Sequence, residues 1–317
     1  MRKSFITLLS ILSLCACTNS ASNPLVSNEF YFDTLVQVKL YDGTKEDIDN
    51  ISSILKKVDG LSDNYENKIN ETSVYALNHS NEEKAISNDL YQLLNTALDL
   101  KTKTNGYFNP FIGSLSKKWK ESLANKQILS QAVINEELDK MNHTSLELNT
   151  SSCTRVGEGE IDLGAMAKGY ALDLVKKYLD NKNEKQYLID GGSSSILLGT
   201  KNTSDGYFKV GLRGTNSYLK LKDCFVGASG TIEQGVIIDG VTYSHIVNPF
   251  TGSVINNYDA TFVVGGNGAL TDALSTSFMM MSVEEIKEME TQYSVSAIVY
   301  KDNKIVYKND TLNLENH

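Results

Sequence analysis

The chain has 317 residues, enough to bury a sizeable core as one large domain or as two closely joined lobes. Its hydrophobic content of 41% and charged content of 22% are ordinary for a soluble globular protein. The formal charge of −9 argues against nucleic acid as a partner, because phosphate backbones are bound through clustered Lys and Arg. Beyond the N-terminal region, no segment stays apolar over the roughly 20 residues that a membrane-spanning helix needs.

The first 16 residues are typical of a bacterial lipoprotein signal peptide. A positively charged start and a short apolar run precede Leu14-Cys15-Ala16-Cys17, which resembles a lipobox. Cys17 is the expected lipid carrier because small Ala16 precedes it, whereas bulky Leu14 precedes Cys15. The sequence therefore predicts a protein anchored to the cell membrane by lipid on Cys17, on the extracytoplasmic face. An ordinary cleaved signal peptide is the alternative.

The remaining chain divides into a tether and a body. Residues 17–28 are rich in Ser and Asn and predict a flexible tether, and residues 29–317 form the body. Only Cys153 and Cys224 remain in the body. They could pair in an oxidising compartment, but two cysteines are no disulfide framework, and we expect buried free thiols.

The first half of the body mixes strands with amphipathic helices. Alternating aromatic and branched residues predict one strand within Glu29–Leu40. Apolar residues at helical spacing predict helices over Thr44–Leu61 and Leu90–Lys103, and a loop running into a helix follows over Gly106–Trp119. A short strand over Glu160–Leu163 should lead through Gly164 into a helix from about residue 165 to 182.

The second half contains more strands and two more helices. Strands are predicted over five segments, Tyr187–Ile189, Phe208–Leu212, Cys224–Ala228, Val236–Ile238 and Ala260–Val264. An apolar helix over Ala269–Met281 precedes a second helix that opens with a Ser-x-x-Glu capping signature at residues 282–285. A hairpin over residues 295–307 closes the chain. Strands in runs with interspersed helices indicate an α+β fold with mixed, largely antiparallel sheets and packed helices.

The strongest local signal is the segment Gly159–Tyr170, with the sequence GEIDLGAMAKGY. A predicted strand ends at Asp162, the chain turns on glycine, and a helix opens with small residues and Lys168. Helix N-termini present free N–H groups and bind anions. The spacing is not that of the nucleotide-binding phosphate loop, and an ordinary strand-to-helix junction is the simpler interpretation of this segment alone.

A second signal lies in the apolar helix. Asp272 and Thr276 are four residues apart and so lie on one helix face, with Ser275 close by. One carboxylate with hydroxyl or carbonyl oxygens suits Mg²⁺, which is usually bound by one or two carboxylates together with substrate phosphates. Taken alone, an Asp near a helix start is more often a favourable partner of the helix dipole.

Two loops also contain candidate functional residues. Tyr243–Gly252 contains His245 before a Pro/Gly turn, and a lone His is more often structural than catalytic. Thr104–Gly113 contains two aromatic residues that could flank a flat ring, although aromatic residues after glycine are more often core anchors.

The order and combination of these motifs resemble the FAD:protein FMN transferase family, the ApbE type, from Phe32 to the last strands. The motifs are Thr-x-Gly-x-Phe-x-Pro at 104–110, Asp-Leu-Gly-x-x-Ala-Lys-Gly at 162–169, Gly-Gly at 191–192, Ser-Gly at 229–230, Ser-His-Ile at 244–246 and Asp-Ala-x-x-Thr at 272–276. The chain departs from the family where Asn109 and Asn248 replace frequent Asp residues, and after Ser229-Gly230.

The resemblance implies a role for each matching position. The implied magnesium ligands are Asp272, Thr276, Ser275 and the carbonyl of Ala165. The implied FAD contacts are Phe32, Tyr107, Phe108, Asn109, Asp162, Lys168 and Ile246. Asp272 and His245 are the candidate catalytic residues, with His245 as a proton acceptor.

The implied reaction is Mg²⁺-dependent transfer of FMN from FAD to a Thr or Ser hydroxyl of an extracytoplasmic acceptor protein, releasing AMP. Three alternatives stay open. A metal-dependent FAD pyrophosphatase would use the same site with water as the nucleophile. A non-catalytic flavin-binding lipoprotein would not need Asp272. A solute-binding lipoprotein would account for the anchor and for none of the motifs.

Overall fold

A large antiparallel sheet organises the molecule. The computed structural model describes residues 23–316 except 202, 213, 214, 232–234, 239 and 256. Eight strands form the sheet in the order β1-β2-β6-β7-β10-β13-β14-β15, and every neighbouring pair is antiparallel. Their bounds are β1 Leu25–Tyr31, β2 Thr34–Leu40, β6 Tyr187–Gly191, β7 Ser195–Leu198, β10 Cys224–Gly230, β13 Ala260–Gly265, β14 Ser296–Lys301 and β15 Lys304–Lys308.

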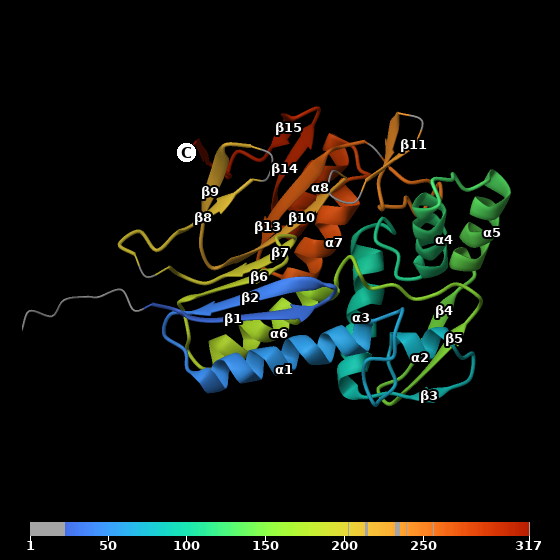
Figure 1. Ribbon diagram of the computed structural model, residues 1–317, viewed down its shortest axis with the longest axis horizontal. Helices are drawn as coiled ribbons and strands as arrows, with labels where there is room; N and C mark the ends of the chain where they lie inside the picture. Colours follow the sequence, from blue (N-terminus) through green and yellow to red (C-terminus); the bar gives the residue numbers. More distant parts are fainter. Residues whose placement is uncertain are drawn as a thin grey trace, which may run out of the picture.

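Smaller sheets and eight described helices surround it (Figure 1). The small sheets contain β3 Lys84–Ala85, β4 Ser145–Leu148 and β5 Ser152–Val156, then β8 Phe208–Gly211, β9 Ser217–Leu221 and β16 Leu314–Asn316, and lastly β11 Val236–Ile238 with β12 Val241–Tyr243. The helices are α1 Lys45–Ser62, α2 Val74–Asn78, α3 Asn88–Lys103, α4 Gly113–Ala124, α5 Gln131–Asn142, α6 Ala167–Asn181, α7 Gly268–Phe278 and α8 Val283–Tyr293. The predicted α+β class with largely antiparallel sheets is confirmed.

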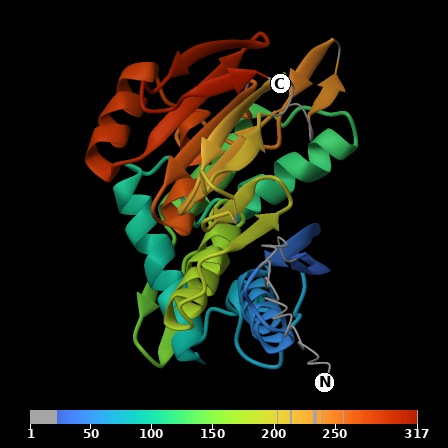
Figure 2. The ribbon, with the colours of Figure 1, turned by 90° about the vertical axis from the view of Figure 1, so that its left-hand side faces the viewer.

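Four helices, α1, α6, α7 and α8, cover one face of the large sheet (Figure 2). Apolar residues of α1 and α6 pack with β2, β6 and β7 in one core cluster, and α7 and α8 pack with β13 and β14 in another. On the opposite face, β8 and β9 pack over β7, β10, β13 and β14 through two further apolar clusters. None of the described helices is long and apolar enough to cross a membrane.

Local sequence signals explain several helix starts. The predicted capping box of α8 is confirmed, since the Ser282 side chain accepts from the Glu285 N–H while the Glu285 carboxylate accepts from the Ser282 N–H. Thr44 and Asp47 form the same reciprocal cap at the start of α1.

Two predicted strands differ in the structure. Glu29–Leu40 was expected to be a single strand, but it is most of a hairpin whose turn residues Phe32 and Asp33 have φ of 52° and 57°. Such turns usually contain Asn or Gly; here the Asp59 carboxylate stabilises the turn by accepting from the Phe32 N–H at 2.9 Å. Residues 160–163 form no strand, because their backbone makes isolated hydrogen bonds and no ladder. These bonds join it to the backbone of Pro110 and Gly113 and to the Asn78 side chain.

Candidate active site

The starts of α6 and α7 cross at two glycines. A Cβ on Gly169 would overlap the carbonyl oxygen of Gly268, so neither position has room for a side chain. Each helix also supplies a carboxylate to the start of the other. Asp173 of α6 accepts from the Gly268 and Ala269 N–H groups at 2.6 and 2.8 Å, and Asp272 of α7 accepts from the Gly169 N–H at 2.7 Å. The crossing therefore fixes Asp272 at the N-terminus of α6.

Asp272 is 7% exposed and its carboxylate is held from two sides. Besides the Gly169 N–H, its Oδ2 atom accepts from the Ser195 hydroxyl at 2.6 Å. Burial raises the pKa of Asp272 to about 7, against the opposing influence of the Lys168 charge and of these hydrogen bonds. Among the described contacts none engages Oδ1, so this oxygen remains available to a ligand.

Hydroxyl groups from β10 and α7 meet within one turn of Asp272. Ser229 of β10 lies 2.9 Å from the Ser275 hydroxyl and 3.0 Å from the Thr276 hydroxyl, and Ser275 donates to the Asp272 carbonyl at 2.8 Å. The hydroxyls of Ser275 and Thr276, two of the four predicted metal ligands, thus meet at Ser229, and Asp272 lies one turn earlier on α7. The fourth, Ala165, is half-buried in the turn before α6 and packs against the core cluster that contains α3.

This donor set fits Mg²⁺. It consists of one carboxylate with hydroxyl oxygens, and a hard cation accepts such ligands while substrate phosphates and waters complete its shell. Over the described residues, no group of three or more His, Cys, Asp or Glu side chains is placed to hold a metal ion.

The charge of Lys168 acts on both the Asp272 carboxylate and His245, the predicted base. This charge favours the ionised form of Asp272 and disfavours the protonated form of His245. His245 is exposed, yet desolvation by the surrounding protein, reinforced by Lys168, lowers its pKa below the ordinary value of 6.5. The imidazole is therefore largely neutral at pH 7 and able to accept a proton.

The start of α6 is less open than the sequence predicts. The Ala167 N–H donates to the Leu163 carbonyl at 2.9 Å, and the Gly169 N–H is engaged by Asp272. The partial positive charge at the start of α6 therefore already stabilises the Asp272 carboxylate, and it is only partly available to a phosphate. The side chain of Lys168 is the cationic group that the helix adds there.

Asp162 connects this motif to the aromatic loop. Its N–H donates to the Pro110 carbonyl at 2.8 Å, while its carboxylate accepts from the Gly164 N–H at the same distance. Burial raises the pKa of Asp162, whereas the Gly164 N–H and the charges of Lys117 and Lys120 act in the opposite direction. The predicted FAD-contacting loops at 104–113 and 159–169 are therefore neighbours.

The aromatic loop also touches the His245 loop. The Tyr107 ring packs edge-on against Phe250, with ring centres 5.0 Å apart, and its hydroxyl donates to Glu285 at 2.8 Å. Ile246 is 5% exposed and belongs to an apolar cluster against which Tyr107 packs. Tyr107 thus fixes one loop against the other.

Other predicted contacts lie deeper in the protein. The Phe108 ring is 5% exposed within a core cluster, so it acts as a core anchor in this structure. Asn109 is 8% exposed and accepts from the Phe111 N–H at 3.1 Å. Phe32 is half-buried and packs against two core clusters at the hairpin turn.

Three site residues were missed from the sequence. The sequence alone does not indicate a role for Ser195 or Asp173, and it presents Ser229 only as part of the Ser-Gly motif. Ser195 follows the Gly191-Gly192 motif in a Ser-rich turn, which was the available signal. Its partner Asp272 is 77 residues away, a separation that no local pattern reports.

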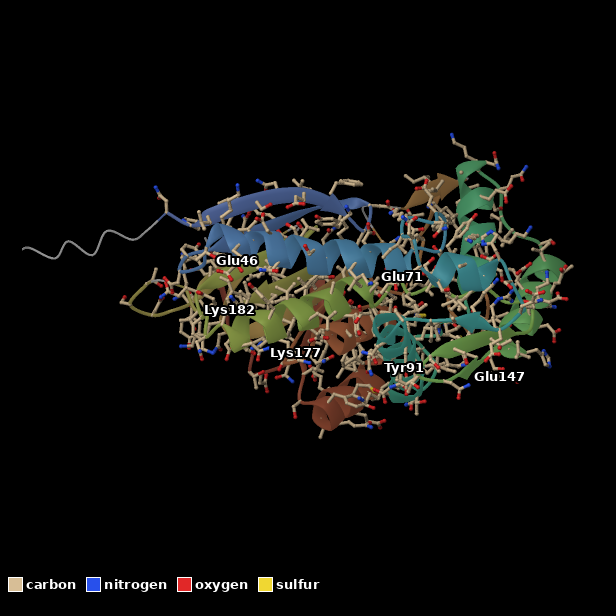
Figure 3. The ribbon with its side chains drawn as sticks, turned by 90° about the horizontal axis from the view of Figure 1, so that it is seen from below. Glu46, Glu71, Tyr91, Glu147, Lys177 and Lys182 are labelled. Atoms are coloured by element: carbon tan, nitrogen blue, oxygen red, sulfur yellow. The ribbon has the colours of Figure 1, made fainter. Side chains whose placement is uncertain are left out.

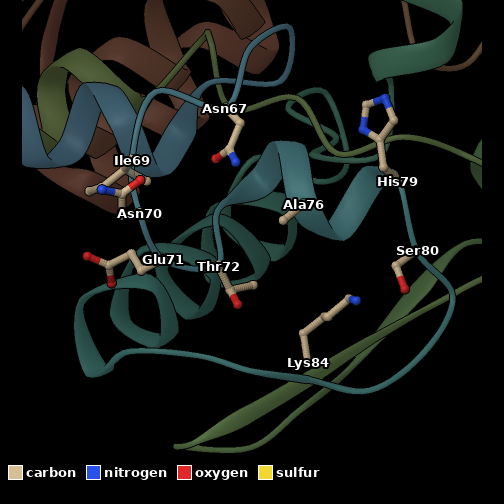
Figure 4. A pocket seen from close by; sticks show the side chains of 9 residues that line it. All are labelled: Asn67, Ile69, Asn70, Glu71, Thr72, Ala76, His79, Ser80 and Lys84. Carbon is tan, nitrogen blue, oxygen red and sulfur yellow. The ribbon is translucent and has the colours of Figure 1, made fainter.

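Two surface hollows lie away from this constellation. One of about 480 Å³ is lined by polar side chains around α2, among them Glu71, His79 and Lys84 (Figure 4). The other, of about 470 Å³, lies between α1 and α6. Neither hollow is lined by a predicted site residue.

The fold is an α+β arrangement in which a buried carboxylate and a cluster of hydroxyl groups meet at the crossing of two helix starts. A model of the ApbE family matches residues 32–299. The chain is 26% identical over 302 residues to a FAD:protein FMN transferase of Vibrio cholerae, covering 90% of this chain and 89% of that protein.

Solved structures show the same fold. The ApbE protein of Thermotoga maritima has a TM-score of 0.78 at 20% identity, covering 91% of this chain and 97% of that one. The flavin transferase ApbE of Vibrio cholerae has a TM-score of 0.72 at 22% identity, covering 92% and 98%. The chain belongs to the ApbE family.

Proposed function

We propose that this enzyme transfers FMN from FAD to a Ser or Thr hydroxyl of another protein and releases AMP. The observation that supports it most strongly is the family match over residues 32–299. Within that match, the motif at 162–169 contacts Asp272 through the Gly169 N–H. Relatives in Vibrio cholerae and Treponema pallidum are named FAD:protein FMN transferases. The acceptor oxygen forms a bond to the FMN-side phosphorus, and the bond from that phosphorus to the bridging oxygen breaks.

Mg²⁺ is the metal proposed for this site, held by Asp272, Ser275 and Thr276 with the Ala165 carbonyl. When bound, it would neutralise charge on the FAD phosphates. The protein prepares the site by holding Asp272 in one orientation through Ser195 and the Gly169 N–H.

Lys168 and His245 have complementary tasks. The Lys168 ammonium stabilises negative charge that develops on the phosphates. His245 accepts the proton that leaves the acceptor hydroxyl, and its lowered pKa keeps it in the neutral form that this task requires. AMP departs with the bridging oxygen, so atoms and charge balance without a further reactant.

Purified protein with FAD, Mg²⁺ and a candidate extracytoplasmic flavoprotein acceptor tests the site. AMP should appear, and Asp272→Ala should abolish it. Asp190→Asn is a matched control, because Asp190 lies on β6 and its carboxylate accepts only from the Ser193 N–H among the described contacts. AMP formation that survives Asp272→Ala would refute this site.

We also propose that lipid on Cys17 anchors the protein to the extracytoplasmic face of the cell membrane, after removal of signal residues 1–16. The support comes from Leu14-Cys15-Ala16-Cys17, which lies outside the described residues. Cys17→Ala should eliminate incorporation of labelled fatty acid in cells. Labelling that survives Cys17→Ala and disappears with Cys15→Ala would move the lipid to Cys15.

A further inference from the structure

The outer face of the β1–β2 hairpin carries exposed apolar side chains near its turn. Phe30 and Leu35 are 68% and 58% exposed and stand opposite each other in the strand pairing. Val26, 49% exposed, lies on the same face four residues before Phe30, because side chains alternate along a strand. We call Val26, Phe30 and Leu35 the hairpin patch.

No described segment covers this patch. The inward-facing residues of β2, such as Val36 and Val38, are buried with α1 and α6, whereas the alternate residues face outward. β1 is also the edge strand of the large sheet. Figure 3 shows the hairpin on the outside of the molecule, beside α1. Between Val26 and the Phe30–Leu35 pair, the same face carries Asn28 and Gln37, whose side chains are hydrogen-bonded to each other. The apolar contact surface is therefore centred on Phe30 and Leu35, and exposed apolar side chains that stand together can mark an interaction surface.

The length of chain before the hairpin indicates what the patch meets. The described chain begins at Asn23, six positions after Cys17, and six residues of extended chain span at most about 22 Å. Leu25 begins β1 two residues later. A lipid on Cys17 therefore keeps the hairpin close to the bilayer whatever path the intervening residues take.

We propose that the hairpin patch docks on the lipid bilayer that holds Cys17. The inference rests on the proposed lipid anchor and is independent of the transfer reaction. Phe30 and Leu35 insert at the headgroup boundary, where apolar side chains gain free energy next to a covalent anchor. Lys39 is paired with Val26 and belongs to the same outer face, so it supplies a positive charge for anionic headgroups.

Docking would also orient the active site. Thr34, beside the hairpin turn, packs so closely on Gly192 that a Cβ there would overlap its hydroxyl. Gly192 begins the turn leading to Ser195, which holds Asp272. The hairpin is thus linked to Asp272 through Gly192 and Ser195. An enzyme docked in this way would act on an acceptor protein held at the same membrane surface.

Tryptophan scanning of the lipidated full-length protein tests the proposal. Phe30→Trp and Leu35→Trp place reporters on the patch, and Val306→Trp is the control. Val306 is 47% exposed on β15, at the opposite edge of the sheet. The single native Trp119 is buried and remains as a constant background. The protein is incorporated into vesicles of anionic and zwitterionic lipid with or without brominated acyl chains.

The two patch reporters should shift to shorter wavelength and lose at least half of their emission to brominated lipid, while the Val306→Trp signal stays unchanged. Equal quenching at all three positions, or none, would overturn the proposal. So would protein that fails to float with the vesicles. A blue shift that precedes vesicle addition and accompanies a doubled mass would assign the patch to a second copy instead. AMP release is measured separately, so failure of docking and failure of transfer remain distinguishable.

Discussion

Ser195→Ala removes a hydroxyl and leaves the backbone of the site in place. Ser195 is 2% exposed, and its hydroxyl donates to Oδ2 of Asp272 at 2.6 Å. In the variant, Oδ2 of Asp272 keeps the hydrogen bond from the Gly169 N–H and loses the one from Ser195. The variant therefore isolates the effect of one hydrogen bond on the proposed metal-binding carboxylate.

The size of the effect follows from the kind of bond. A hydrogen bond to a charged group contributes about 1.5–3 kcal/mol. Loss of an outer partner of a metal ligand typically costs about 10–100-fold in metal affinity. Without Ser195 the pKa of Asp272, already raised to about 7 by burial, should rise further, so that protons compete more strongly with the metal.

Calorimetry of FAD binding at several Mg²⁺ concentrations provides the assay. Ser195→Ala should need about 10–100-fold more Mg²⁺ for half-maximal FAD binding at pH 7. Ser193→Ala is the matched control from the same turn, because Ser193 is exposed and among the described contacts only its N–H is bonded, to Asp190. Equal magnesium dependence of both variants and the native protein would refute the role assigned to Ser195.

Three further outcomes are expected. Gly169→Ala should lower the free energy of unfolding by about 1–3 kcal/mol in urea titrations, because its Cβ would overlap Gly268, whereas Gly211→Ala meets nothing within 4 Å and should change little. Lys168→Met should raise the pKa of His245 towards 6.5 in an NMR titration, since a nearby positive charge is removed; an unchanged or lower pKa would contradict the assignment. Transfer should slow as the pH falls through the His245 pKa, because only neutral imidazole accepts a proton, and His245→Asn should lose this acidic limb along with about 10²- to 10⁴-fold of turnover.

Periodic apolar residues made most helices predictable. The spacing in residues 44–61 and 90–103 gave helices whose ends agree with α1 and α3 to within two residues. The hairpin turn at Phe32–Asp33 was not predictable, because its positive φ angles come from a tertiary contact with Asp59 and not from a turn residue.

In the candidate site, contacts within one helix could be predicted from the sequence, whereas contacts between distant segments could not. Asp272 and Thr276 were placed together because four residues of helix separate them, which is a local property. The contacts of Ser229 with Ser275 and Thr276 span 46 and 47 residues and depend on how β10 packs against α7. Phe108 looked like a ligand contact within its motif, yet its ring fills the core, and only the packing reveals this.

The central claim is that a protein hydroxyl, and not water, receives the FMN half of FAD. The most direct measurement is the ratio of covalent flavin to AMP when the enzyme acts on FAD, Mg²⁺ and an extracytoplasmic acceptor. Covalent flavin is measured as fluorescence that survives denaturing electrophoresis, and AMP by chromatography of the same reaction. The account predicts one covalent flavin for each AMP. Free FMN equal to the AMP, with no flavin on any acceptor protein, would contradict it and identify a pyrophosphatase.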